Sequence, residues 1–227
     1  MSVKFTWLGH SAFMFDIDGH EVLVDPFLTG NPLASAQASS MNPEVILLSH
    51  AHGDHLGDTV EIAKRTGALV ISNFEISNWM ANQGVKNVVG VNPGGSFYGD
   101  YFSAKWTIAH HSSSFPDGTY GGQPNGFILR GGGSTIYFAG DTSLFLDMQL
   151  IGDEGIDVAF LPIGDHFTMS PVDSLRAIEF IRPEFVVPMH YNTFPPIVQD
   201  VPDWANRVNS ETDAKPIVLD PGGSHSL

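Results

Sequence analysis

Seven consecutive residues, Ser49-His50-Ala51-His52-Gly53-Asp54-His55, constrain the fold of this chain more than any other feature of its sequence. They bring three imidazoles and a carboxylate together directly after the apolar run Val45 to Leu48. An unbroken apolar run is typical of a strand that is covered on both faces. Because a buried polar group needs its own partner, such a cluster is energetically unfavourable as simple packing. The segment therefore predicts a metal site at the end of a buried strand.

The alternatives to a metal site are a solvated His-rich loop and the remnant of an affinity tag. The cluster lies inside the chain, between a predicted strand and a predicted helix, and this position argues against a tag. His50 and His52 alternate, so they can approach one ion from the same side of an extended turn. Asp54 and His55 then point elsewhere, which suits a second ion nearby.

The lack of cysteine in the sequence restricts the chemistry further. Disulfides, Cys-ligated zinc, iron–sulfur clusters and a thiol nucleophile are all excluded. A metal ion must therefore be held by imidazole and carboxylate groups. Such ligands suit Zn²⁺, while Mn²⁺, Fe²⁺ and Ni²⁺ remain alternatives.

Charge and hydropathy narrow the range of partners. Basic residues number 10 against 25 acidic ones, a formal net charge of −15, which disfavours nonspecific binding of nucleic acid. The first seven residues carry one basic side chain and no continuous apolar stretch, unlike a signal peptide. No apolar run approaches the roughly 20 residues of a membrane span. We expect a cytoplasmic protein with a small-molecule substrate and no nucleic-acid or membrane partner, and we leave a homo-oligomer open.

Short apolar segments that alternate with helical patterns indicate the α/β class, as either a doubly wound sheet or a two-sheet sandwich. Hairpin signals such as Asp18-Gly19 and Gly131-Gly132-Gly133 favour mixed, partly antiparallel sheets. No linker divides residues 1–227, so we expect one domain. The expected strands are 3–8, 12–17, 21–24, 45–48, 68–71, 88–91, 101–109, 127–130, 135–139, 158–161, 185–189 and 217–219, and the expected helices are 56–66, 74–82, 171–182 and 203–211.

Three more predicted strands run directly into His or Asp residues. Strand 135–139 is followed by Gly140 and Asp141, strand 185–189 by His190, and strand 101–109 by His110 and His111. Each residue alone has an ordinary explanation, such as a helix cap or a hydrogen-bonded core histidine. Because sites in such folds form at strand ends, four strand ends with metal-binding side chains together favour a shared site.

At these residues the chain resembles the metallo-β-lactamase superfamily, whose signature is similar to His50-x-His52-x-Asp54-His55. The resemblance is closest to its UPF0173 family of metal-dependent hydrolases, related to the ascorbate-phosphate lactonases. It covers nearly the whole chain and is carried by Gly9-His10-Ser11, Asp25-Pro26-Phe27-Leu28-Thr29-Gly30-Asn31-Pro32, Gly140-Asp141, Leu161-Pro162-Ile163-Gly164-Asp165 and His190-Tyr191-Asn192-Thr193-Phe194-Pro195.

The resemblance implies a four-layer αββα sandwich of two mixed β-sheets flanked by helices, with two divalent metal ions at one edge. The first ion would be held by His50, His52 and His111. The second would be held by Asp54, His55 and His190, with Asp141 bridging both. Zinc is the expected metal, and Asp54, Asp141 and His190 are the expected catalytic residues.

Such a pair of ions implies a hydrolase in which a metal-bridging hydroxide attacks an ester, a lactone or a similar carbonyl substrate. One alternative is a phosphodiesterase that uses the same dinuclear site on a small phosphodiester. A nuclease is disfavoured because the sequence has no cluster of Lys and Arg. An alternative of another class is a protein that binds metal without catalysis, although structural zinc sites are usually single.

Further residues are candidates for the surroundings of the metal ions. Ligating imidazoles usually donate their other N–H to an oxygen, so His10, Asp25 and Asp165 are expected to orient the ligands. Asp25 could equally be a turn former before Pro26, and His10 a residue with a purely structural hydrogen bond. The candidates for substrate contact, each beside a strand end, are His166, Tyr191 and Asn192.

The neighbours His110 and His111 give conflicting signals. Alternation along strand 101–109 places His110 on the largely apolar face with Trp106, which would point it inward. A ligand at this edge stands beyond the last pair of the strand, however, where alternation no longer holds. Small residues follow, Ser112 to Ser114, and allow the backbone to turn close to an ion. We therefore expect His111 to be the ligand and His110 to pack nearby.

Overall fold

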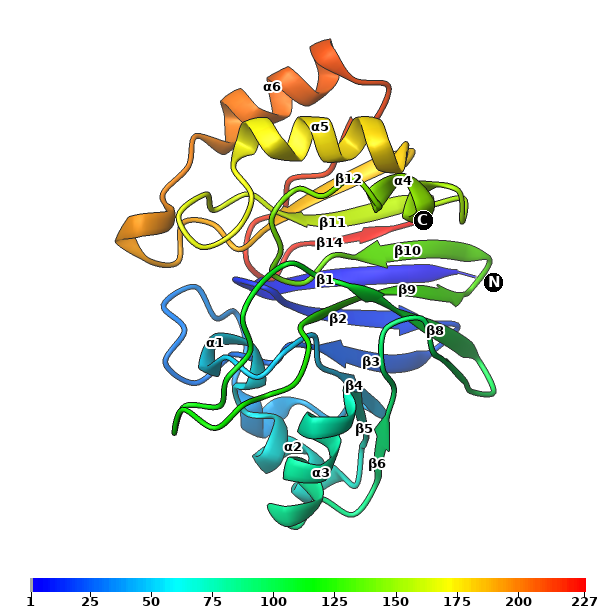
Figure 1. The fold of residues 1–227 in the computed structure, drawn as a ribbon, viewed down its shortest axis with the longest axis vertical. Helices are drawn as coiled ribbons and strands as arrows, with labels where there is room; N and C mark the ends of the chain where they lie inside the picture. Colours follow the sequence, from blue (N-terminus) through cyan, green and yellow to red (C-terminus); the bar gives the residue numbers. More distant parts are fainter. Residues whose placement is uncertain (1) are drawn as a thin grey trace.

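The computed structural model describes residues 2–227 and contains two β-sheets that face one another, with helices on their outer sides (Figure 1). The first sheet has the strand order β14-β1-β2-β3-β4-β5-β6, and the second has the order β13-β12-β11-β10-β9-β8-β7. Both sheets are mixed. In the first, β1, β2 and β3 pair antiparallel whereas β3, β4, β5 and β6 pair parallel. In the second, β7, β8, β9 and β10 pair antiparallel whereas β10, β11, β12 and β13 pair parallel. This is the four-layer αββα arrangement that the family resemblance implies, and it excludes the doubly wound sheet that the residue patterns left open.

The strands of the two sheets are short, and most coincide with predicted segments. Those of the first sheet are β1 (Val3–Gly9), β2 (Ala12–Ile17), β3 (His20–Val24), β4 (Val45–Leu47), β5 (Leu69–Ser72), β6 (Val88–Gly90) and β14 (Ser224–Ser226). Those of the second are β7 (Ser96–Tyr98), β8 (Phe102–Ile108), β9 (Asn125–Gly131), β10 (Ser134–Phe138), β11 (Val158–Pro162), β12 (Phe185–Met189) and β13 (Lys215–Pro216).

The helices form the outer layers, with α3 beside β5 and β6, and α5 against β11 (Figure 1). Ser170 caps α5 as predicted, because its hydroxyl accepts a hydrogen bond from the Asp173 N–H at 3.0 Å. Among residues 2–227, no helix combines the length and apolarity needed to cross a bilayer. The helices are α1 (Gly53–Leu56), α2 (Thr59–Thr66), α3 (Phe74–Asn82), α4 (Met148–Gly152), α5 (Pro171–Ile181) and α6 (Val201–Glu211), with 3₁₀ turns at Ala38–Ser40 and Pro195–Ile197.

Aromatic side chains fill the space between the sheets. The ring of Phe160, from β11, lies 5.0 Å from that of Phe5, 4.9 Å from that of Phe13 and 5.2 Å from that of Phe15. All three contacts have edge-to-face geometry, which is the favoured arrangement of aromatic pairs. Because Phe160 belongs to one sheet and its partners to the other, this cluster fastens the two sheets together.

The predicted helix over 56–66 is wrong at its start. Gly57 has φ +44°, and a Cβ there would lie 2.2 Å from the carbonyl oxygen of Pro26. The chain therefore breaks between α1 and α2 at a position that only glycine can occupy. As a result, Asp54 and His55 lie in the short helix α1, which follows the loop after β4.

Elements at the edges of the sheets also differ from the prediction. The last strand was predicted at 217–219, but β13 lies two residues earlier, at Lys215–Pro216. The strands β7 and β14 and the helix α4 were not predicted. Each has five residues or fewer, and β14 reads Ser-His-Ser, without the apolar alternation that reveals a strand. It forms because β1 offers an edge with which it can pair.

Removal of the Phe160 ring should destabilise the protein strongly. We expect Phe160→Ala to lower the free energy of unfolding by about 3–5 kcal/mol, because it leaves a cavity between the sheets. Urea denaturation in the presence of a chelator measures this without a contribution from metal. Phe167→Ala is the control, since that ring is 54% exposed and its loss should change stability by about 0.5 kcal/mol or less. Equal effects of the two substitutions would contradict this account of the core.

Candidate metal centre

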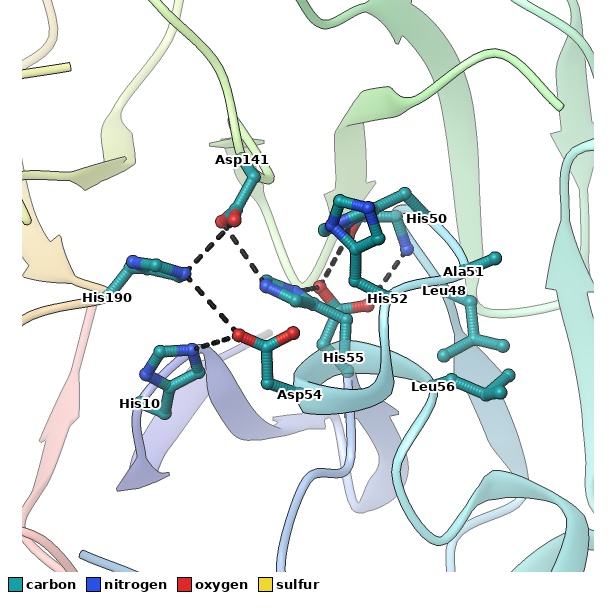
Figure 2. A network of polar contacts seen from close by, with 12 residues as sticks. His10, Leu48, His50, Ala51, His52, Asp54, His55, Leu56, Asp141 and His190 are labelled. Carbon is teal, nitrogen blue, oxygen red and sulfur yellow. Dashed lines mark hydrogen bonds and ion pairs between the residues drawn. The ribbon is translucent and has the colours of Figure 1, made fainter. Parts of the chain in front are cut away.

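The ends of strands from both sheets meet at one edge of the sandwich. The strand β4 of the first sheet leads into His50-Ala51-His52-Gly53-Asp54-His55, whereas β8, β10 and β12 of the second sheet lead to His111, Asp141 and His190. Figure 2 shows His190 and Asp141 reaching toward Asp54 and His55, which come from the other sheet. The structure thus brings together all seven predicted ligands, from four segments that are far apart in the sequence.

His50, His52 and His111 form the first group of donors, and their ligand atoms lie within 4.8 Å of one another. Nε2 of His50 lies 3.0 Å from Nδ1 of His52. The His111 ring stands 5.2 Å from the His50 ring and 5.1 Å from the His52 ring. These three imidazoles are the residues that the family resemblance assigns to the first ion, and they lie close enough together to hold one.

Asp54, His55 and His190 form the second group, which His10 joins. Asp141 lies between the two groups. Its Oδ1 is 3.3 Å from Nε2 of His55, and its Oδ2 is 3.0 Å from Nε2 of His190 and 3.6 Å from Nε2 of His111. A single carboxylate therefore approaches donors of both groups, as a bridging ligand would.

The spacing and bonding of these atoms fit a divalent cation. Two ligands of one tetrahedral zinc ion, each about 2.1 Å from it, lie about 3.4 Å apart. The measured separations of 3.0 to 3.6 Å within the cluster agree with that value. Nε2 of His55 and Oδ1 of Asp141 are buried without a hydrogen-bond partner, because their contact lacks hydrogen-bond geometry. Buried polar atoms require a partner, and a cation between these two atoms would provide it.

Asp25, directly after β3, controls which ring nitrogens face the cluster. Its Oδ2 accepts from Nδ1 of His55 at 2.7 Å and from Oγ of Ser49 at 2.5 Å, and its Oδ1 accepts from the Ser49 N–H. The Ser49 hydroxyl donates to Asp25, so it must accept the proton of His50 Nδ1, 3.0 Å away. Both imidazoles therefore carry a hydrogen on Nδ1 and direct Nε2 into the cluster.

The protonation states of His50 and Asp141 also favour cation binding. Burial lowers the pKa of His50, so this imidazole is neutral at pH 7. Burial raises the pKa of Asp141, but the neighbouring His190 and His55 outweigh it and hold that pKa well below its usual range. A neutral imidazole and an ionised carboxylate are the forms that bind metal ions.

His111 and His110 point in different directions. The buried positions of β8 alternate as far as Trp106, but Ile108 is exposed and Ala109 is buried, so the alternation shifts by one residue at the end of the strand. The shift carries His111 into the first group and leaves His110 exposed, with its ring 4.9 Å from that of Phe145. The structure thus places His111, and not His110, with the other donors of the first group.

Of the residues predicted to surround the metal ions, some contact the candidate ligands in the structure and others are exposed to solvent. Asp25 and His10 contact ligands, His55 and Asp54 respectively. Asp165 and His166 are exposed, and within residues 2–227 no hydrogen bond or ion pair joins either side chain to a ligand. Asp165, with φ +68°, follows Gly164, which packs against the backbone of His190, but the Asp165 side chain remains exposed.

The two other candidates for substrate contact have structural roles in their own loop. Tyr191 is buried, with its ring 5.2 Å from that of Trp7, and burial raises the pKa of its phenol. The side-chain oxygen of Asn192 accepts from the Gln199 N–H at 2.8 Å. Sequence reasoning missed Ser49 and Thr193, whose hydroxyls contact His50 and His10, because a lone hydroxyl beside a histidine carries no pattern.

The chain is similar to known metal-dependent hydrolases. The profile of the beta-lactamase superfamily domain matches residues 4–190. A UPF0173 metal-dependent hydrolase from Thermus thermophilus is 50% identical over 209 residues, which cover 92% of each chain. Another, from Deinococcus radiodurans, is 44% identical over 228 residues, which cover 99% of this chain and all of that protein. The chain belongs to the UPF0173 family of the metallo-β-lactamase superfamily.

Solved structures place this UPF0173 hydrolase in the same fold. Igni18, a metallo hydrolase from Ignicoccus hospitalis, is 40% identical and superposes with a TM-score of 0.92 over 100% of this chain and 99% of its own. An isothiocyanate hydrolase from Delia radicum gut bacteria is 17% identical, with a TM-score of 0.78 over 99% and 98% of the two chains, and shares the fold. The UPF0173 protein is a metal-dependent hydrolase.

Substitution of the two adjacent histidines should separate their roles. We expect His111→Ala to lose about one metal ion per chain, because the first group would keep only two imidazoles and structural or catalytic zinc needs three or more protein ligands. His110→Ala is the matched control and should retain the metal content of the natural protein. Metal analysis of both purified variants provides the measurement, and the reverse result would assign the ligand to His110.

Metal binding should release protons, because the pKa of His55 is raised. Burial alone would lower that pKa, but Asp141 and Asp25 outweigh it and raise it well above 6.5, so metal-free His55 is protonated at pH 7. A cation must displace this proton, and its apparent affinity therefore rises with pH up to the His55 pKa.

Calorimetric titration with zinc, in buffers of different ionisation enthalpy, measures this proton release. We expect about one proton to leave the His55 side chain when the second group is filled. Asp25→Asn removes one of the carboxylates that raise the His55 pKa, so it should reduce the release and weaken zinc binding about 10–100-fold. Zinc binding to the natural protein at pH 7 without proton release would contradict the assigned charge of His55.

Proposed function

We propose that this UPF0173 hydrolase binds two divalent metal ions, preferably zinc, and hydrolyses an ester, a lactone or a similar carbonyl substrate. The observation that carries the proposal is the position of Asp141, whose carboxylate lies within 3.6 Å of imidazole nitrogens from both donor groups. The first ion would be held by His50, His52 and His111, and the second by Asp54, His55 and His190, with Asp141 shared between them.

Bound divalent ions supply a water of lowered pKa and polarise the substrate oxygen that they contact. The chain itself supplies proton transfer and orientation. The side chain of Asp54 is 32% exposed, against 3% for that of Asp141, so Asp54 is the carboxylate that solvent and substrate can reach. His10 occupies Oδ2 of Asp54, which leaves Oδ1 to orient the attacking water and accept its proton. Burial raises the pKa of Asp54, but His10 and His55 hold it below its usual range, so the carboxylate is ionised.

Apolar rings beside the second group favour a carbonyl substrate. Phe27 and Phe194 are partly exposed, and their rings lie 5.8 Å and 5.7 Å from the ring of His10 and 6.3 Å from each other. Apolar surface can accept the acyl chain or ring of an ester or lactone, whereas a phosphodiester would lose hydration of its charge there. The net charge of −15 likewise supports a small, uncharged substrate over nucleic acid.

We further propose that residues 1–227 act as one domain in the cytoplasm.

Turnover by metal-loaded protein should be tested on aliphatic lactones, p-nitrophenyl esters and bis(p-nitrophenyl) phosphate. We expect hydrolysis of the carbonyl substrates, loss of activity with a chelator and recovery when zinc is restored. Turnover of the phosphodiester alone would identify a phosphodiesterase, and two bound ions without turnover of any substrate would support the non-catalytic alternative.

Asp141→Ala tests whether the shared carboxylate is required. We expect kcat/KM to fall by more than about 100-fold, because removal of a ligand should exceed the 10–100-fold effect of removing a residue that orients one. Metal content should fall as well, while the circular dichroism spectrum should remain that of the folded protein, since Asp141 lies beyond the end of β10. Near-normal turnover by this variant would contradict a bridging role for Asp141.

A further inference from the structure

His10 lies in the tight turn between β1 and β2 and is completely buried. Its backbone has φ +58°, a conformation that a histidine adopts rarely and at some energetic cost. The carbonyl oxygen of His10 accepts two hydrogen bonds, one from the indole N–H of Trp7 at 2.9 Å and one from the backbone N–H of His190 at 3.2 Å. The backbone of His10 is thus fixed to the segment that carries a predicted ligand.

The side chain of His10 joins a predicted ligand to a neighbouring loop. Its Nε2 lies 3.2 Å from Oδ2 of Asp54, a contact drawn in Figure 2, and its Nδ1 lies 2.8 Å from Oγ1 of Thr193. The ring also packs 4.1 Å from the ring of His190. His10 therefore has a partner on each ring nitrogen and a packing contact on its face.

These partners determine where the hydrogen of the His10 ring must be. The Asp54 carboxylate is ionised and can only accept a hydrogen bond, so the hydrogen sits on Nε2. Nδ1 then carries a lone pair and accepts from the hydroxyl of Thr193. That hydroxyl has one other acceptor within reach, the carbonyl oxygen of Tyr191, but at 3.3 Å it is the more distant of the two.

We propose that His10 is a positioning residue that holds Asp54 through its Nε2–H, and that Thr193 fixes His10 in the tautomer that makes this possible. The hydrogen bond fixes one oxygen of Asp54 and so determines the direction of the other. His10 itself stays outside the ligand set, although it lies among Asp54, His55 and His190, because its Nε2 lone pair is replaced by a hydrogen. The inference rests on the proposed metal centre but not on the identity of the substrate.

The tautomer of His10 can be measured directly in zinc-loaded protein. Long-range ¹H–¹⁵N correlation NMR distinguishes the two ring nitrogens of each histidine, and His10→Gln identifies the His10 signals by their loss. We expect hydrogen on Nε2 and a hydrogen-bonded lone pair on Nδ1. Hydrogen on Nδ1, with Nε2 bound to the metal, would make His10 a ligand and overturn the proposal.

Substitutions separate positioning by His10 from a merely structural role. His10→Gln places an N–H donor near the position of Nε2, whereas His10→Leu fills the space without a donor. We expect zinc affinity at the weaker of the two sites to fall about 10–100-fold in His10→Leu and to be largely rescued in His10→Gln. Thr193→Val removes the hydroxyl and should also weaken zinc binding, whereas Thr193→Ser keeps the hydroxyl and should not.

Thermal unfolding of the metal-free variants shows whether each of them folds, and His110→Gln is the control for a histidine outside the cluster. Equal zinc affinity in His10→Leu and His10→Gln would refute the role of the donor. The tautomer of His10 and the affinity for zinc are measured without substrate, so neither result depends on whether the protein hydrolyses esters or lactones. If every ester and lactone proves inert, only the proposed activity fails.

Discussion

A single buried carboxylate, that of Asp25, determines the chemical character of the metal centre. It receives Nδ1–H of His55 directly and that of His50 through the hydroxyl of Ser49, and it thereby turns two Nε2 atoms toward the same space. Asp25 comes directly after β3, with φ +42° before a proline, so the backbone is held in an unfavourable conformation for this purpose. The position of β3 beside β4 brings Asp25 to the start of the His-rich segment. The pairing of β3 with β4 therefore determines both the position of Asp25 and the ring nitrogens that the cluster presents.

The ligands could be predicted from the sequence because each of them follows a strand. A strand of β-branched and aromatic residues is recognisable, and a His directly after it has little freedom, as at His190. The same reasoning places Asp165 and His166 near the site, yet both are exposed. Asp165 stands three residues beyond β11, the same distance as separates Asp141 from β10 and His111 from β8. Distance from a strand end therefore does not decide which side chain joins the site, because the conformation of the connecting residues, such as φ +68° at Asp165, determines its direction.

Most strands and the order of the layers follow from apolar alternation and turn residues, whereas the edges of the sheets do not. The strands β13 and β14 have two and three residues and are polar or interrupted by proline. Their pairing depends on the edges that β12 and β1 present, which is a tertiary property. The role of His10 belongs to the same class. Its four hydrogen-bond partners are Trp7, Asp54, His190 and Thr193, and no local pattern connects these positions.

The link between the His10 carbonyl and the His190 N–H joins residues 180 positions apart in the chain. Loops of that length close late, because non-local contacts form only after the chain entropy of the intervening segment has been lost. The first donor group has two of its three imidazoles within His50-Ala51-His52, but its third, His111, follows β8 of the other sheet. Both donor groups therefore require the docking of the two sheets. Because a metal ion would bind the docked arrangement and not a partly folded chain, metal binding would stabilise the contact between the sheets.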